Sequence, residues 1–352
     1  MSEKHPRISS SATEMYDGIV SRKFFLLIIL FLGVILSFIV DVVTGPAWLS
    51  LSEVAAALLF GENSTNRMII WVIRLPMACM AIFVGAALGL AGAQMQTILD
   101  NPLASPYTLG ISAAAGFGAA LAIVLGVGVL PGGNEFLVPL NAFLFSMLCC
   151  ISIYLIAWRK RGTTETLVLA GIALLFLFNA LTTFLEYIST QEDLQAVVFW
   201  LFGSLSKSTW PKVAFVGAVL VIVIPFFLMD AWKLTAMRLG DSKAQSLGVN
   251  VPRLRIKSLL LISVLTATAV CFVGIIGFVG LVSPHIARMM VGEDHRYYLP
   301  ASLLGGALLL SVSSIASKLV IPGSVFPIGI ATSCIGVPFF LYLILRRRSE
   351  FW

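Results

Sequence analysis

Long, continuous apolar segments are the feature of this chain that most restricts its fold. Nine of them are close to the length of about 20 helical residues that crosses a hydrocarbon core about 30 Å thick. None of them shows the alternation of a membrane strand, so we expect helices, which satisfy their own backbone hydrogen bonds inside lipid. The segments are residues 24–43, 75–95, 109–130, 136–158, 167–188, 213–229, 256–282, 298–321 and 325–345.

The composition excludes several classes of protein. Only 11% of the 352 residues are charged and 59% are hydrophobic, whereas soluble domains carry about 25% charged residues. A soluble enzyme, a disordered protein and a nucleic-acid binder are therefore excluded, and no nucleic acid is expected as a partner. The five cysteines lie in apolar stretches and only three histidines occur, so we expect neither a metal site nor a cofactor.

A tenth span is expected within residues 256–291, where Pro284 interrupts a long glycine-rich segment. With ten spans and a cytoplasmic N-terminus, 18 of the 23 lysines and arginines fall on the cytoplasmic side. Nine spans would place the arginines of residues 346–348 outside, against the positive-inside rule. The sequence thus predicts an all-α polytopic membrane protein of about ten transmembrane helices with both termini in the cytoplasm.

The chain divides simply along its length. Residues 1–23 are expected to form a cytoplasmic N-terminal tail, residues 24–348 a single membrane domain, and residues 349–352 a C-terminal tail. The first apolar stretch is longer than the core of a signal peptide, and no clean cleavage site follows it. It is therefore interpreted as the first membrane helix.

Small and polar residues inside the spans indicate how the helices pack. Gly85 and Gly89 form a pair of the kind that lets helix backbones approach closely in lipid. Asp41 and Asp230 stand at helix ends, and we expect them at the membrane interface.

Two spans carry a polar face. Asn179, Thr183 and Glu186 lie on one side of the fifth span, and Thr332 and Gly336 share a side of the last, with Ser333 next to them. Such faces either form hydrogen bonds between helices or line a translocation path.

Two stretches, residues 74–106 and 253–288, resemble each other. Each starts with a basic residue, continues as a long helix, becomes glycine-rich and closes on Ser-Pro. In the ten-span topology they enter from opposite sides, so we expect an inverted internal repeat, which in transporters places the pathway at the repeat interface. A chance resemblance between two apolar helices is the alternative.

The charged residues and motifs argue that this chain does not drive transport by itself. No chain of ionisable groups crosses the membrane, and no phosphate-binding loop is present. The most polar internal segment, about residues 231–257, is expected in the cytoplasm. Within it Asp241 or Ser242 is predicted to cap a short helix that Gly248 ends in a left-handed conformation, which forms either a solvated loop or a docking element.

Several motifs now coincide with a known family. The chain resembles the permease subunits of the FecCD type, which belong to type II ATP-binding-cassette importers for iron–siderophore complexes, haem and cobalamin. The resemblance covers about residues 20–348. It rests on RLP at 74–76, GAALGLAG at 85–92, NPLASP at 101–106, LG at 109–110, AQSLG at 244–248, GFVGLVSPHIAR at 277–288 and PIG at 327–329.

The resemblance implies partners and a location. It implies a bacterial inner-membrane permease that pairs with a second permease subunit, identical or different. Two ATPase subunits would bind inside and a substrate-binding protein would bind outside.

The resemblance also implies roles for particular residues. The segment containing Asp241, Ala244, Leu247 and Gly248 matches the element that couples to the ATPase. Arg74 matches a residue that docks the binding protein, and Lys318 stands where relatives can carry another. Met77 replaces a second basic residue of that pattern. The fifth and tenth helices line the path of the family, which favours the translocation interpretation of Asn179, Thr183, Glu186, Thr332, Ser333 and Gly336.

The function expected from these observations is ATP-driven import of a ferric siderophore by alternating access. Haem or cobalamin is the alternative cargo. The chain itself would not be an enzyme, because a separate subunit hydrolyses ATP. A secondary transporter working alone and a non-transporting membrane scaffold are the remaining alternatives.

Overall fold

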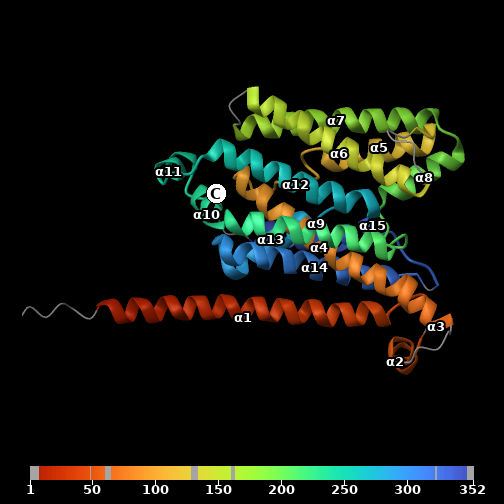
Figure 1. Cartoon of the computed structure of the whole chain (residues 1–352), viewed down its shortest axis with the longest axis horizontal. Helices are drawn as coiled ribbons and strands as arrows, with labels where there is room; N and C mark the ends of the chain where they lie inside the picture. Colours follow the sequence, from red (N-terminus) through yellow and green to blue (C-terminus); the bar gives the residue numbers. More distant parts are fainter. Residues whose placement is uncertain are drawn as a thin grey trace, which may run out of the picture.

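The protein is a bundle of long helices that run side by side (Figure 1). The computed structural model describes residues 8–47, 49–59, 65–127, 134–159, 163–321 and 323–346. The expected tail at 349–352 and residues 1–7 of the other expected tail lie outside these ranges. The larger helices are α1 (Ile8–Val43), α4 (Leu75–Ile98), α5 (Ile111–Leu125), α6 (Asn134–Arg159), α7 (Thr164–Ile188), α9 (Trp210–Met229), α12 (Val251–Val273), α13 (Val279–Val291), α14 (His295–Leu319) and α15 (Ile328–Arg346).

Short helices occupy the two ends of the bundle. In Figure 1, α10 (Ala231–Met237) and α11 (Asp241–Ser246) lie at the end where α1 begins. At the other end lie α2 (Leu51–Leu59) and α3 (Thr65–Met68), followed by the π-helical turn η1 (Ile69–Arg74) that leads into α4. A further short helix, α8 (Gln191–Leu201), follows α7 and was not expected from the sequence.

The all-helical fold agrees with the expectation from the apolar segments. Seven helices in the described ranges have the length and apolar character needed to cross a membrane. Three shorter apolar helices accompany them, Ile111–Leu125, Val279–Val291 and Ile328–Tyr342. These three are shorter than the roughly 20 residues that a crossing needs. The count of ten spans therefore stays a prediction, as does the inverted repeat.

Two boundaries differ from those expected. Helix α1 begins at Ile8, so residues 8–23 of the expected cytoplasmic tail are helical, and their place outside the membrane stays a prediction. The break in the segment 256–291 does not lie at Pro284, which is inside α13. It lies at residues 274–278, between the end of α12 at Val273 and the start of α13 at Val279. Glycine is required at position 274, because its φ is +75° and an added Cβ would lie 2.3 Å from the Trp200 carbonyl oxygen.

Helix α4 occupies the centre of the bundle, in contact with α9, α12, α13 and α14. Its glycines allow this position, since a Cβ on Gly85 would lie 2.4 Å from the Gly306 carbonyl oxygen of α14. On Gly92 it would lie 1.8 Å from the Gly280 carbonyl oxygen of α13. The small residues predicted to mediate close packing therefore face neighbouring backbones directly.

A buried ion pair fixes the end of α1 to α14. Lys318 Nζ lies 2.8 Å from Asp41 Oδ1, and Ser314 Oγ donates to the same carboxylate at 3.0 Å. The two side chains of the pair are 1% and 0% exposed. The carboxylate of Asp41 is thus enclosed between two helices, and its expected place at the membrane interface stays a prediction.

Enlarging Gly92 should loosen the centre of the bundle. Gly92→Val is expected to lower the thermal unfolding midpoint of the purified chain in detergent, because overpacking costs about 1–3 kcal/mol. Gly18→Ala in α1 is the control, since an added Cβ there meets nothing within 4 Å. An unchanged midpoint for Gly92→Val would contradict the backbone contact.

Removing one partner of the buried pair should destabilise the chain strongly. Lys318→Met leaves the enclosed carboxyl group of Asp41 without its partner, a loss of about 3–5 kcal/mol for comparable pairs. The double variant Asp41→Leu/Lys318→Met removes both charges and should recover most of the loss. Thermal unfolding at neutral pH measures all three, and equal midpoints for the single and double variants would argue against the pairing.

Candidate functional site

Helix α11 is a small projection at one end of the bundle. Ala244 is fully buried and anchors it, whereas Lys243 and Leu247 are exposed. Gly248 has φ +85° and ends the element in the left-handed conformation predicted for it. The predicted cap by Asp241 or Ser242 is wrong, because Gly240, with φ +95°, precedes the helix and makes no side-chain cap.

Ion pairs hold the segments on either side of α11. Asp230, between α9 and α10, binds Lys233 at 2.8 Å and also binds Lys257 of α12. Burial disfavours the charge of Asp230, but the two lysines outweigh burial and hold its pKa below the ordinary value. Its backbone is thus tied to α12 by a carboxylate that stays ionised at neutral pH. The expected interfacial place of Asp230 is compatible with its position just beyond the apolar helix α9.

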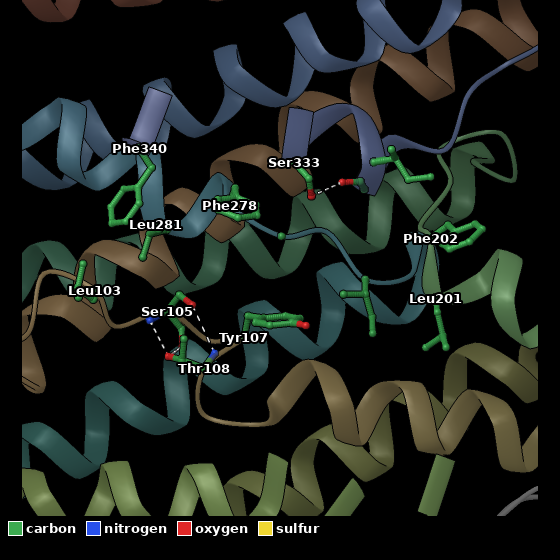
Figure 2. A pocket seen from close by; sticks show the side chains of 14 residues that line it. Leu103, Ser105, Tyr107, Thr108, Leu201, Phe202, Phe278, Leu281, Ser333 and Phe340 are labelled. Atoms are coloured by element: carbon green, nitrogen blue, oxygen red, sulfur yellow. Dashed lines mark hydrogen bonds between the residues drawn. The ribbon is translucent and has the colours of Figure 1, made fainter. Parts of the chain in front are cut away.

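A cavity of about 670 Å³ opens between segments from four parts of the chain (Figure 2). The connection from α4 to α5, the end of α8, the break at residues 274–278 and helix α15 line it. None of its lining residues is charged. Its polar groups include the hydroxyls of Ser105, Tyr107, Thr108 and Ser333, and Thr108 Oγ1 is already committed to the Ser105 carbonyl oxygen at 2.7 Å.

The residues proposed for the path in α15 do not share one environment. Ser333 lines the cavity and donates a hydrogen bond to the Gly329 carbonyl oxygen at 2.8 Å. Thr332 is fully buried and bonds the same oxygen at 3.0 Å. Gly336 faces Phe278, whose Cβ would lie 2.6 Å from an added Cβ. Thr332 and Gly336 are therefore enclosed within the single chain, and their assignment to the path stays a prediction.

The polar face of α7 lies apart from α15. Asn179 and Thr183 are exposed and Glu186 is half-buried, while the helix packs mainly against α5, α6 and α8. Figure 1 shows α7 on one flank of the bundle. The structure of one chain therefore does not bring the two predicted polar faces together.

The two predicted docking cations are both enclosed. Arg74 is 3% exposed and donates to the carbonyl oxygens of Val43 at 2.5 Å, Val42 at 3.2 Å and Ala47. Lys318 is held by Asp41. Both charges therefore have partners within the chain, and their role in docking a binding protein stays a prediction. Both cations are buried because they donate hydrogen bonds to carbonyl oxygens at the C-terminal end of α1, and Lys318 also pairs with the Asp41 carboxylate.

Sequence reasoning missed the residues that shape the cavity most. Phe278 holds φ +65° and Leu103, Tyr107 and Ile275 approach the same space. The signals in the sequence are the motif at 101–106 and the glycine-rich break, neither of which by itself indicates a cavity. No pattern in the sequence indicates a left-handed phenylalanine.

Comparisons with known proteins agree on one family. The model of the FecCD transport family matches residues 30–346. A hemin transport system permease of Yersinia pestis is 37% identical over 324 residues, which are 91% of this chain and 97% of that one. An Fe(3+)-citrate import system permease of Bacillus subtilis is 37% identical over 321 residues, 91% and 95% of the two chains.

A solved structure extends the likeness to the fold. It is a metal-chelate type ABC transporter in an inward-facing conformation, 30% identical, with a TM-score of 0.81. The match covers 92% of this chain and 99% of that chain. Relatives of this kind are membrane-spanning subunits that work with separate ATPase and substrate-binding partners. The chain therefore belongs to the FecCD transport family and is a permease of the ABC importers for metal chelates.

Proposed function

We propose that this chain is the permease through which a ferric siderophore enters the cytoplasm, driven by two ATPase subunits. The observation that carries the proposal is the uncharged cavity that α15 helps to line. A large chelate needs a wide space that holds it weakly, and an uncharged wall offers no strong ion pair to a passing complex.

Two copies of the chain, or this chain and a sister permease, would enclose the path. On the polar face of α7, Asn179 and Thr183 are exposed in the single chain and Glu186 is half-buried. Polar side chains in a membrane helix face protein or a wet cavity rather than lipid. A second permease subunit supplies such an environment. The proposed path residues therefore remain Asn179, Thr183, Glu186, Thr332, Ser333 and Gly336.

The ATPases would bind at the end of the bundle that carries α10 and α11. Closure of the ATPases on ATP would press on α11, and the helices around the cavity would tilt to open the path on the other side. The break at residues 274–278 supports this motion, because it divides one apolar segment into two helices that can change their angle. A substrate-binding protein would deliver the chelate at the opposite end.

The proposed location is the inner membrane of a bacterial cell, with both termini in the cytoplasm. Figure 1 places the start of α1 at the same end as α10 and α11. That end also carries Arg238, Arg253, Arg255 and Lys257, as the positive-inside rule requires of a cytoplasmic face.

Cargo is the finer part of the proposal. Ferric siderophore is preferred, and the relative that imports Fe(3+)-citrate supports a ferric chelate. Haem is the second candidate because another relative transports hemin, and cobalamin is the third. The test is uptake of radiolabelled ferrichrome, haemin or cyanocobalamin by vesicles that contain the permease, its ATPases and its binding protein. Uptake driven by an ion gradient without any ATPase would instead establish a secondary transporter.

Gly248 provides a test of the docking surface. Gly248→Arg is expected to abolish ATP-driven uptake, because a long cation occupies the face that meets the ATPase, whereas membrane insertion continues. Gly248→Asn is the matched control, since asparagine tolerates a positive φ and an added Cβ meets nothing within 4 Å. Normal uptake by Gly248→Arg would count against this surface.

Neighbouring positions in α15 provide a test of the path. In a Cys334→Ser background, Ser333→Cys should react with a water-soluble maleimide in the assembled importer, because Ser333 lines the cavity. Thr332→Cys is one residue away and fully buried, so it should react far more slowly. Equal labelling of the two positions would show that the cavity is not the aqueous route.

A further inference from the structure

The end of α4 is held by three other helices and by Arg238, the residue that follows α10. Gln96, Thr97 and Ile98 and the following Asp100 each contact a polar side chain from another part of the chain. Gln96 and Thr97 are buried at 0% and 2% exposure. Along the rest of α4 the buried residues are mainly small and apolar, so the polar contacts gather at this end of the helix.

Two of these contacts come from α13 and α14. Arg288 Nη2 donates to Gln96 Oε1 at 3.2 Å. His295 Nε2 lies 2.8 Å from Thr97 Oγ1, and its Nδ1 lies 3.3 Å from Thr235 Oγ1 of α10. The imidazole therefore stands between the end of α4 and the element that leads to α11.

The other two contacts are made by arginines, and each arginine lies next to α10 or binds α11, the helices where the ATPases would bind. Arg255 Nε donates to the Ile98 carbonyl oxygen at 2.8 Å, and its Nη2 binds Asp241 of α11 at 3.0 Å. Arg238, just after α10, binds Asp100 at 2.7 Å and Glu293 at 2.5 Å. The planar guanidinium suits this role, because it donates in two directions at fixed angles.

The turn leads directly to the cavity. Asp100 holds φ +44° and, with Phe278, is one of two described residues other than glycine with a positive φ. The segment after it contributes Leu103, Ser105 and Thr108 to the cavity wall. A displacement of Asp100 would therefore be passed to that wall within a few residues of backbone.

We propose that Arg238 and Arg255 are positioning residues that make the last turn of α4, and with it the cavity wall at 101–108, move together with α10 and α11. This proposal rests on the proposed function, since the motion would begin where the ATPase binds. Burial opposes the charge of Glu293, but Arg238 and Arg288 outweigh it and keep its pKa below the ordinary value. The anchor of Arg238 thus stays charged at neutral pH.

Stability alone does not account for the Arg238–Asp100 contact. The side chain of Asp100 is 69% exposed, and ion pairs with an exposed partner contribute little to folding. Loss of this contact should therefore leave the fold intact and reveal whether the contact passes movement from α10 and α11 to the cavity wall.

The test compares variants in vesicles that contain the complete importer, with ferrichrome, haemin or cyanocobalamin as cargo according to which the parent moves. Asp100→Gly removes the side chain at a backbone angle that glycine adopts freely, and Arg238→Gln removes the other partner. ATP hydrolysis should stay within about twofold of the parent. Cargo moved per ATP should fall about tenfold, within the range of roughly 5- to 150-fold typical of coupling between sites.

Two further variants separate transmission from general damage. Asp100→Asn keeps the left-handed angle and an acceptor for Arg238, so its ratio of cargo to ATP should lie between those of Asp100→Gly and the parent. Arg296→Gln removes a cation at the same end whose partner Asp294 is two residues away, and its ratio should equal that of the parent.

Each contrary result has a distinct meaning. An unchanged ratio of cargo to ATP in both Asp100→Gly and Arg238→Gln overturns the proposed joint movement, while the proposed function stands. Loss of ATPase binding or of folding in both variants also overturns it, because the contacts would then be structural. If the parent importer shows no ATP-dependent uptake, the proposed function is contradicted, and the proposed joint movement is contradicted with it.

A distance measurement tests the same idea without cargo. Spin labels at Leu103 and Leu247, both exposed, report on the cavity wall and on the docking element in a Cys334→Ser background. In the parent assembly their separation should be the same with and without ATP, because the two segments move together. Asp100→Gly should make that separation depend on nucleotide, and a nucleotide-dependent separation in the parent would refute joint movement.

Discussion

Close contact between helix backbones at α4 is the constraint on which the rest of the structure depends. Lipid offers no hydrophobic force to drive helices together, so proximity must come from packing and from polar contacts. The glycine face of α4 meets the backbones of α13 and α14 without side chains between them. This places the end of α4, and the connection that follows it, in the middle of the molecule. The cavity can therefore draw its wall from segments far apart in the sequence.

The two ends of the bundle use buried charge differently. At the end of α1, Arg74 donates to carbonyl oxygens and Lys318 pairs with the Asp41 carboxylate, and all of these side chains are enclosed. At the end with α10 and α11, the arginines bridge separate segments through partly exposed carboxylates. The first arrangement resists any change of geometry, because separating its members would leave a charge in an apolar setting. The second arrangement can shift, because water can replace a lost contact.

Much of this architecture could be predicted from the sequence. Hydropathy located the segments that became the long helices, and the glycine spacing identified the packing face of α4, because both depend only on local composition. The left-handed turn at Gly248 is predictable for the same reason. The direction of side chains around α15 could not be predicted. Periodicity places Thr332 and Gly336 on one face, but it does not say whether that face meets Phe278 or open space. The enclosure of Lys318 also depends on a carboxylate 277 positions earlier, a distance that no local pattern reveals.

The glycines of this chain fall into two kinds with opposite consequences for variation. Those of α4 have a neighbouring backbone where a methyl group would be, so any larger residue is felt by the isolated polypeptide. Gly248 has vacant space around it, so many replacements leave the isolated polypeptide sound. A survey that scores only expression and heat resistance would pass such replacements as harmless. Their cost would emerge only in a living cell that depends on the complete importer for growth.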